Sequence, residues 1–160
     1  MKNLGWALGC LVLSAGVVSA GGGSLNGTFH KGAAIGGRYV FPGQTIHITG
    51  EQAAGSVSGG PLTGSAQFAT DEEILVVPSA NGNFHMKMVV TTGNGSVVTV
   101  SLEGKTSGFS LSAQTVNVSG SWRVLSATGP DAGLRGEGSF TGLEDFNTGD
   151  TQGNFTGQLH

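Results

Sequence analysis

The sequence predicts an all-β protein: a single antiparallel β-barrel of about eight to ten strands, with no substantial helix after the N-terminal segment. Glycine provides 30 of the 160 residues, far above the usual share of about 7%, and each glycine inside a helix costs roughly 1 kcal/mol relative to alanine. Short runs of Thr, Val, Ile and Phe are bounded by Gly, Asn, Ser and Asp, as strands are. The glycines do not follow a Gly-X-Y period, which excludes a collagen triple helix.

The N-terminal segment has the three parts of a secretory signal peptide. Lys2 provides the positive charge, an apolar run follows, and Val18-Ser19-Ala20 places small residues where signal peptidase cleaves. Glycines interrupt the apolar run, which is too short for a good membrane span. We expect residues 1–20 to be removed.

The chain from residue 21 to residue 160 is then expected to form one exported domain, in the periplasm, the cell envelope or the extracellular space, with no membrane span. Cys10 raises the alternative of a lipoprotein, but Ala7 occupies the position where a lipobox has a Leu-like residue. Because Cys10 is the only cysteine, the exported domain would contain no disulfide and would depend on its core and strand pairing.

Eleven runs of strand-forming residues follow in chain order, each ending at residues typical of turns. They are Ser24–His30, Arg38–Phe41, Gln44–Gly50, Ser65–Ala69, Glu73–Val77, Asn83–Thr91, Ser96–Leu102, Gly108–Ser112, Thr115–Thr128, Gly133–Thr141 and Gly153–Leu159. The long run from Thr115 is expected to bend at Gly120. So many short strands without a helix between them indicate a closed barrel or a sandwich.

The segments between these runs carry recognisable turn residues. Pro42-Gly43 favours a type II turn. Asn81-Gly82 and Asn94-Gly95 favour hairpins, the second with a type I′ turn. The acidic run Asp71-Glu72-Glu73 is expected to be a solvated loop, and Pro130-Asp131 ends the long strand.

Alternation along the strands predicts which side chains face the core. Phe84, Met86 and Met88 share one side of their strand with Val90, while His85, Lys87 and Val89 share the other. The two methionines are therefore expected to pack in the core. The apolar run Ile74–Val77 has no alternation and predicts a strand covered on both faces.

A short pattern recurs along the chain. Asn26-Gly27-Thr28-Phe29-His30 and Asn81-Gly82-Asn83-Phe84-His85 share an Asn-Gly-x-Phe-His frame, and Gly153-Asn154-Phe155-Thr156 repeats part of it. This recurrence has two possible explanations. It reflects chance in a chain rich in Gly and Asn, or it marks a repeated structural unit.

Residues 120–142 carry a second glycine pattern, which includes Thr128-Gly129, Ala132-Gly133 and Gly136-x-Gly138-Ser139-Phe140. This segment resembles secreted bacterial β-barrel proteins of the allene oxide cyclase/dirigent-like type. The resemblance implies an antiparallel eight-stranded barrel and assigns no catalytic residue to this chain.

Charge and motifs exclude several function classes. Seven basic and ten acidic residues give a net charge of −3, so no basic excess supports nucleic-acid binding. The chain has no Gly-x-Ser-x-Gly, no His-Glu-x-x-His and no phosphate-binding loop. Glu144-Asp145 is interpreted as a pair of surface acids rather than a catalytic dyad.

Histidines are the strongest candidates for chemistry. His30, His47, His85 and His160 each follow an apolar residue, so they are expected to point away from the core. Imidazole is a good ligand for copper or zinc, and we predict that these histidines form a metal site, with copper favoured. The alternatives are four unconnected surface histidines, or buried histidines that form hydrogen bonds within the protein.

A copper ion on a rigid exported barrel would allow redox chemistry of the superoxide-dismutase type. Such a site needs cations that steer a small anion, and Arg38 and Arg123 are the predicted catalytic residues, with Lys87 and Arg135 as further candidates. Two other functions stay open: a barrel that binds a small apolar ligand in its interior, and a non-catalytic protein of a cell-envelope assembly.

Overall fold

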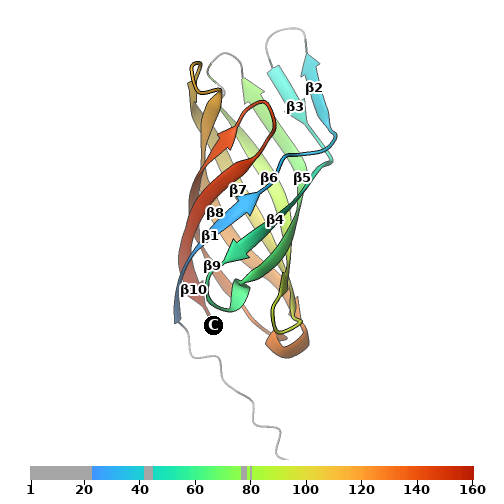
Figure 1. Cartoon of the computed structure of the whole chain (residues 1–160), viewed down its shortest axis with the longest axis vertical. Coiled ribbons are helices and arrows are strands. Elements are labelled where there is room, and N and C mark those ends of the chain that lie inside the picture. Colours follow the sequence, from blue (N-terminus) through green and yellow to red (C-terminus); the bar gives the residue numbers. More distant parts are fainter. Residues whose placement is uncertain (1–22, 42–44, 77–78, 80) are drawn as a thin grey trace, which may run out of the picture.

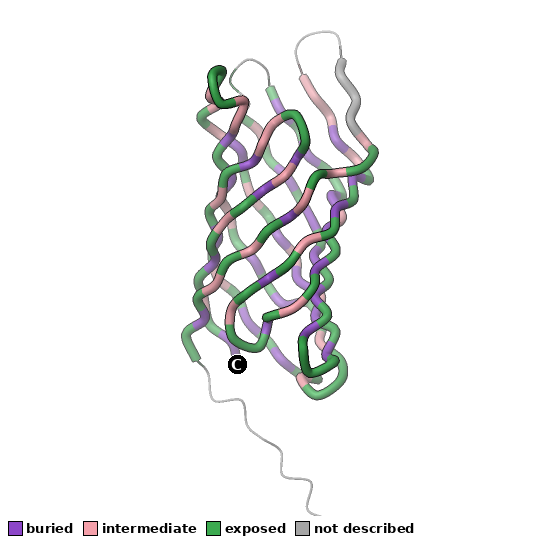
Figure 2. The backbone as a smooth tube through the Cα atoms, viewed as in Figure 1, coloured by how far each residue is buried: buried purple, intermediate pink, exposed green. Residues whose placement is uncertain are grey.

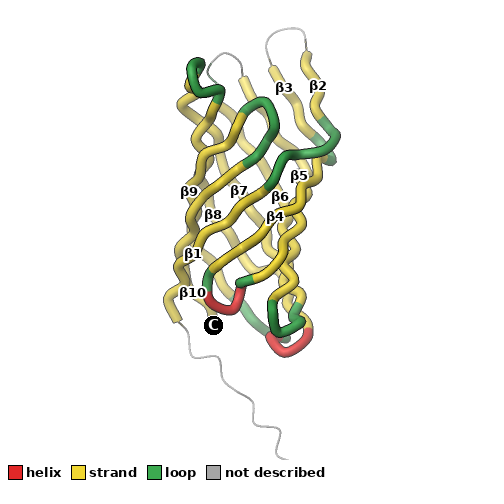
Figure 3. The backbone as a smooth tube through the Cα atoms, viewed as in Figure 1, coloured by secondary structure: helices red, strands yellow, loops and turns green. Residues whose placement is uncertain are grey.

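The computed structural model describes residues 23–41, 45–76, 79 and 81–160, and for residues 38–41 it describes the backbone alone. The predicted signal segment, the predicted Pro42-Gly43 turn and the side chain of Arg38 lie outside the described part. The described residues form ten strands and two 3-10 turns, whose arrangement is shown in Figure 1 and Figure 3. The strands are β1 Gly23–Lys31, β2 Arg38–Phe41, β3 Thr45–Ile48, β4 Glu51–Ser58, β5 Gly64–Val76, β6 Asn81–Thr92, β7 Val97–Ser110, β8 Thr115–Thr128, β9 Gly136–Asp145 and β10 Thr151–Leu159.

The predicted antiparallel barrel is confirmed. Neighbouring strands follow the order β5-β4-β1-β10-β9-β8-β7-β6, and β6 pairs with β5 again, which closes the barrel with eight strands. All of these pairings are antiparallel. The two 3-10 turns, Gly60–Leu62 and Gly129–Asp131, have three residues each, and the described residues include no helix that is long and apolar enough to cross a membrane.

Strands β3 and β4 follow one another along the same edge of β5. β4 pairs with residues 64–70 of β5, while β3 pairs with residues 73–76. β2 pairs with β3, so a hairpin extends the sheet at the end that is uppermost in Figure 1. We call this the upper end; the C-terminus lies at the lower end.

Buried residues recur along the barrel strands, in alternation with exposed or half-buried ones (Figure 2), and their side chains form the core. Phe84, Met86, Met88 and Val90 are all buried and point inward from β6, which confirms their predicted face. The core also includes Phe68, Trp122, Phe140 and Phe155 together with valines of β7 and β8.

Inward-facing glycines make room for the aromatic rings. A Cβ atom on Gly153 would lie 2.5 Å from the ring of Phe29, and one on Gly27 would lie 2.4 Å from the ring of Phe155. These distances are far below van der Waals contact, so a side chain at either position would displace the ring. The high glycine content thus serves the barrel interior as well as the turns.

The interior leaves little free space. One void lies among apolar side chains that include Phe29 and Trp122, a second lies nearer the upper end beside Glu144, and each has a volume of about 20 Å³. A volume of this size holds about one water molecule. Neither void could take up an organic molecule, so they do not provide the hollow interior that the ligand-binding alternative requires.

Strand β5 differs from the sequence-based prediction. Two separate runs and an acidic loop were expected over residues 65–77, but Gly64–Val76 is one continuous strand. Its register against β6 shifts between Thr70 and Glu72, which indicates a β-bulge. Glu73 is buried, so the prediction of a wholly solvated acidic loop was wrong.

The apolar run after the bulge is covered on one face only. Leu75 is buried, whereas Ile74 is 41% and Val76 50% exposed. The expectation that both faces are covered is therefore wrong for these residues. β5 turns one face to the barrel interior, and none of the described residues forms a second layer over Ile74 and Val76.

Two turns also differ in detail from their predictions. Asn81 and Gly82 already belong to β6, where they pair with Val76 and Leu75, so the β5–β6 turn precedes them. The predicted hairpin at Asn94-Gly95 exists, but only Gly95 of the two has a positive φ, of 87°. A type I′ turn would need a positive φ at both residues.

Polar side chains occupy the upper end of the interior. Lys31 on β1 and Glu51 on β4 are both nearly inaccessible, and Lys31 Nζ lies 3.4 Å from Glu51 Oε1. Lys31 also donates a hydrogen bond of 2.7 Å to the carbonyl oxygen of Gly149. The turn between β9 and β10 is thereby attached to β1.

Candidate functional site

Two histidines and two glutamates alternate on four neighbouring strands. His47 lies on β3, Glu72 on β5, His85 on β6 and Glu103 on β7. Glu72 pairs directly with His85, and His85 pairs directly with Glu103. His47 pairs with the residue two positions beyond Glu72, which makes it a diagonal neighbour of that carboxylate. We call these four residues the His–Glu row.

The carboxylate of Glu72 lies at the centre of this row. His47 Nε2 is 3.0 Å from Glu72 Oε1, and the two side chains are 31% and 53% exposed. On the other side, directly paired residues of an antiparallel sheet have Cβ atoms about 4.5–5.5 Å apart, so His85 stands within side-chain reach of Glu72. One carboxylate therefore lies between two imidazoles.

The bulge in β5 gives this row its composition. Asp71 and Glu72 are both exposed, whereas Thr70 and Glu73 on either side are buried. An extra residue on the bulged strand allows two consecutive side chains to face solvent. Asp71 forms a 3.2 Å ion pair with Lys87, so Glu72 is the carboxylate that faces the histidines.

The donor set fits a transition metal. Two neutral imidazoles and a carboxylate suit copper or zinc, and the exposed side would leave coordination positions open. As the side chains lie, no three His, Cys, Asp or Glu residues among those described are grouped closely enough to hold an ion. His85 is exposed and has no hydrogen bond or ion pair within the described residues, so it is free to rotate toward Glu72.

The other two predicted ligands do not join this row. His30 lies on β1, where its Nε2 atom is 2.9 Å from Asp150 Oδ2. His160 lies at the lower end, where its backbone exchanges hydrogen bonds with Arg135. The structure thus places His47 and His85 on strands on either side of Glu72 and leaves His30 and His160 apart from them.

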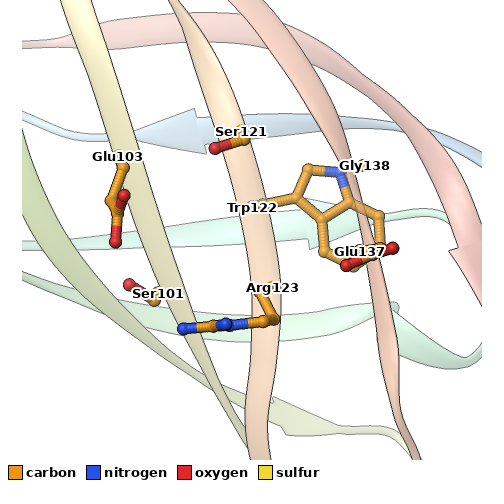
Figure 4. Close-up of a pocket in the computed structure, with 7 residues that line it drawn as sticks. All are labelled: Ser101, Glu103, Ser121, Trp122, Arg123, Glu137 and Gly138. Carbon is orange, nitrogen blue, oxygen red and sulfur yellow. The ribbon is translucent and has the colours of Figure 1, made fainter.

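Arg123 lies in a separate hollow of about 450 Å³ on the outer face of β7, β8 and β9. Its guanidinium extends toward β7, close to Ser101, with which it pairs, and Glu103 and Glu137 also line the hollow (Figure 4). Arg123 is two strands from His85, which corresponds to about 10 Å across a sheet. It can influence an ion there only through its charge.

Sequence analysis missed the two glutamates of the row. Glu72 was assigned to a loop, and Glu103 was not singled out at all. The sequence did contain one indication of such a neighbour. A hairpin between residues 73–77 and 83–91 places an acidic residue opposite His85 in several registers. The β-bulge determines which acidic residue pairs with His85, and no clear sequence pattern predicts a β-bulge.

Comparison with known proteins identifies no relative. No family model matches the chain, and neither a curated protein nor a solved structure matches it at the threshold used. The proposal below therefore rests on the residues of this chain alone.

Proposed function

We propose that this protein is an exported metal-binding β-barrel, with copper favoured over zinc, and that His47, Glu72 and His85 hold the ion. The observation that supports this most directly is the 3.0 Å contact between His47 and Glu72, with His85 paired to the same glutamate across the next strand. The segment 1–20, which has the features of a signal peptide, supports export.

Copper is favoured for two reasons. Sites built from nitrogen and oxygen donors bind Cu²⁺ more tightly than Zn²⁺. The row is also exposed, so one side of the ion would remain open. Glu72 and His85 lie on paired strands of the closed barrel, and His47 lies on β3, which pairs with β5 outside it. The methionines at positions 86 and 88 are buried and are not proposed as ligands.

A bound copper ion at such a site would supply one-electron redox chemistry, of which superoxide dismutation is the simplest case. The chain would contribute binding and steering of a small anion. Lys87 lies on the same strand as His85, and Arg123 lies two strands away. These two residues are the proposed steering cations, together with Arg38 from the sequence-based prediction.

Metal titration of untagged protein tests this proposal. The wild-type chain should bind about one Cu²⁺ ion, measured by calorimetry and by elemental analysis after desalting. Changing a group that merely supports a ligand costs about 10–100-fold in affinity, so His47→Ala and His85→Ala should each weaken binding by at least that factor.

His160→Ala is the matched control, because it removes an exposed histidine at the far end of the barrel. It should bind copper as the wild type does, and superoxide dismutation should be lost in His85→Ala but kept in His160→Ala. Substoichiometric copper in the wild type, or equal affinity in all three variants, would refute the metal site. Stoichiometric copper without dismutation would leave the site and refute the reaction.

A further inference from the structure

One part of the outer surface differs from the rest in charge. The outward side chains of β4, β1 and β10 are Ser, Thr, Asn, Gln, Ala and a single His. None of them carries a carboxylate, an ammonium or a guanidinium group. The charged outward side chains of the described strands lie instead on β5, β6, β7, β8 and β9. We call the surface of β4, β1 and β10 the neutral face.

A hollow of about 380 Å³ lies within this face, in the size range of about 300–1,000 Å³ that small-molecule sites occupy. Its lining combines hydroxyl and amide groups with one imidazole: Thr28, His30, Ser56, Ser58, Gln152 and Asn154. Phe29 and Gly153 also line the hollow. At Gly153 the barrel wall consists of backbone only, because glycine has no side chain.

Strand register groups these residues into two rows. Ser58, Thr28 and Asn154 form one row across β4, β1 and β10, and Ser56, His30 and Gln152 form the next. Successive side chains in a row come from adjacent paired strands, so they are about 5 Å apart. The result is a regular grid of hydrogen-bonding groups on a rigid sheet.

Five of the six side chains have no hydrogen-bonding partner among the residues that the structure describes. Thr28, Ser56, Ser58, Gln152 and Asn154 form no side-chain hydrogen bond to any described residue, whereas His30 contacts Asp150. Each hydroxyl or amide can both donate and accept hydrogen bonds. A ligand that arrives at this hollow therefore meets donors and acceptors that do not have to break contacts within the protein.

We propose that the hollow in the neutral face binds a neutral glycan. Sugar hydroxyls donate and accept in the same way as the groups of the lining, and the lack of formal charge gives an ionic ligand no attraction to this face. This inference does not depend on the metal site, which occupies other strands.

Titration calorimetry with maltoheptaose, chitotetraose and dextran as neutral probes, and with polygalacturonate as an anionic probe, tests the proposal. At least one neutral probe should bind saturably, and the double variant Gln152→Ala/Asn154→Ala should bind it roughly tenfold more weakly, since two hydrogen-bonding side chains are lost. The matched control is Asn117→Ala/Ser121→Ala, which removes an amide and a hydroxyl from the exposed face of β8, two strands away from β10, and should bind as the wild type does.

Circular dichroism and thermal unfolding must show that both double variants are folded. No saturable binding of any neutral probe, preference for the anionic probe, or equal loss in both double variants would overturn the proposal. Sedimentation must also show a monomer at the concentrations used. A dimer that the Gln152→Ala/Asn154→Ala change disrupts would assign this face to a second copy of the chain instead.

Discussion

Lys31 is a charged residue that the barrel interior accommodates by pairing its ammonium group. Its side chain is only 4% exposed, yet it contacts both the carboxylate of Glu51 and the carbonyl oxygen of Gly149. A buried ammonium group is costly unless it is paired and hydrogen-bonded. The same contacts join β1, β4 and the turn between β9 and β10.

Replacement of this lysine should be strongly destabilising. Lys31→Ala leaves the Glu51 carboxylate buried without this partner, so the free energy of unfolding should fall by about 3–5 kcal/mol, measured by urea denaturation. Lys87→Ala is the control, because its ion pair with Asp71 is about half exposed on both sides and contributes at most about 1 kcal/mol. Equal losses in the two variants would contradict this account of Lys31.

Predictions for single residues succeeded where alternation alone decides the face. Met86 and Met88 are in the core as expected, and His30 and His85 point outward. Prediction failed for Glu73, because its burial depends on a bulge and on groups at the upper end of the barrel. Sequence spacing contains no information about either.

Among the connecting elements, the turn between β6 and β7 is stabilised by several side-chain hydrogen bonds, three of which involve Asn94. Asn94 Oδ1 accepts hydrogen bonds from the Thr92 hydroxyl at 2.6 Å and from the Ser96 amide at 3.0 Å. Asn94 Nδ2 donates to Asp131 at 3.0 Å, and Asp131 lies in the 3-10 turn after β8. Asn94 therefore links two neighbouring connections at the lower end.

Loss of the Asn94 side chain should loosen both connections. Asn94→Ala removes three hydrogen bonds of a largely exposed residue, and we expect a decrease in unfolding free energy of about 1–2 kcal/mol, measured by urea denaturation. Amide exchange of residues 92–96 and 129–132 should also become faster. Asn83→Ala, which removes an exposed asparagine without a side-chain hydrogen bond in the described structure, should change neither quantity; comparable effects would argue against this role.

Several elements could be located from composition, but not their full extent. The runs predicted at Thr115–Thr128 and Gly153–Leu159 match β8 and β10 closely. β7 extends through two predicted runs, and β5 joins two others across the acidic segment. In both strands, polar and glycine residues interrupt the apolar pattern. The strands nevertheless continue, because neighbouring strands on both sides pair with their backbone groups.

The short recurring pattern also has a structural counterpart. In β1, β6 and β10 the glycine points into the barrel, and the phenylalanine two positions later points inward as well. In β1 and β10 each glycine lies under the ring of the other strand, since Gly27 meets Phe155 and Gly153 meets Phe29. The pattern therefore has a packing role in these two strands.

For the whole molecule, closure depends on the two ends of the described chain. β1 and β10 pair over nine residues, from Gly23 with Leu159 to Lys31 with Thr151. Pairing of segments so distant in sequence is slow to form and costly in loop entropy. Without it, β1 and β10 would each present an unpaired edge.

Removal of β10 should therefore abolish cooperative folding. A chain that lacks residues 151–160 also loses Phe155 and Leu159 from the core, and it should show no sharp thermal transition by circular dichroism and increased binding of a hydrophobic dye. A chain that lacks only His160 should unfold as the wild type does. A sharp transition in the shorter chain would show that the barrel can close without β10.

The sequence by itself determined the fold class, most strand positions and the inward or outward direction of most side chains. These follow from local properties: glycine and β-branched content, turn residues and a period of two. It also singled out the four histidines. The tertiary structure, and not the sequence pattern, places Glu72 in contact with His47 and directly opposite His85, keeps His30 and His160 apart from this row, and gives β4, β1 and β10 a shared uncharged face. Those relations depend on register, on one bulge and on closure of the barrel, and each of these joins residues far apart in the chain.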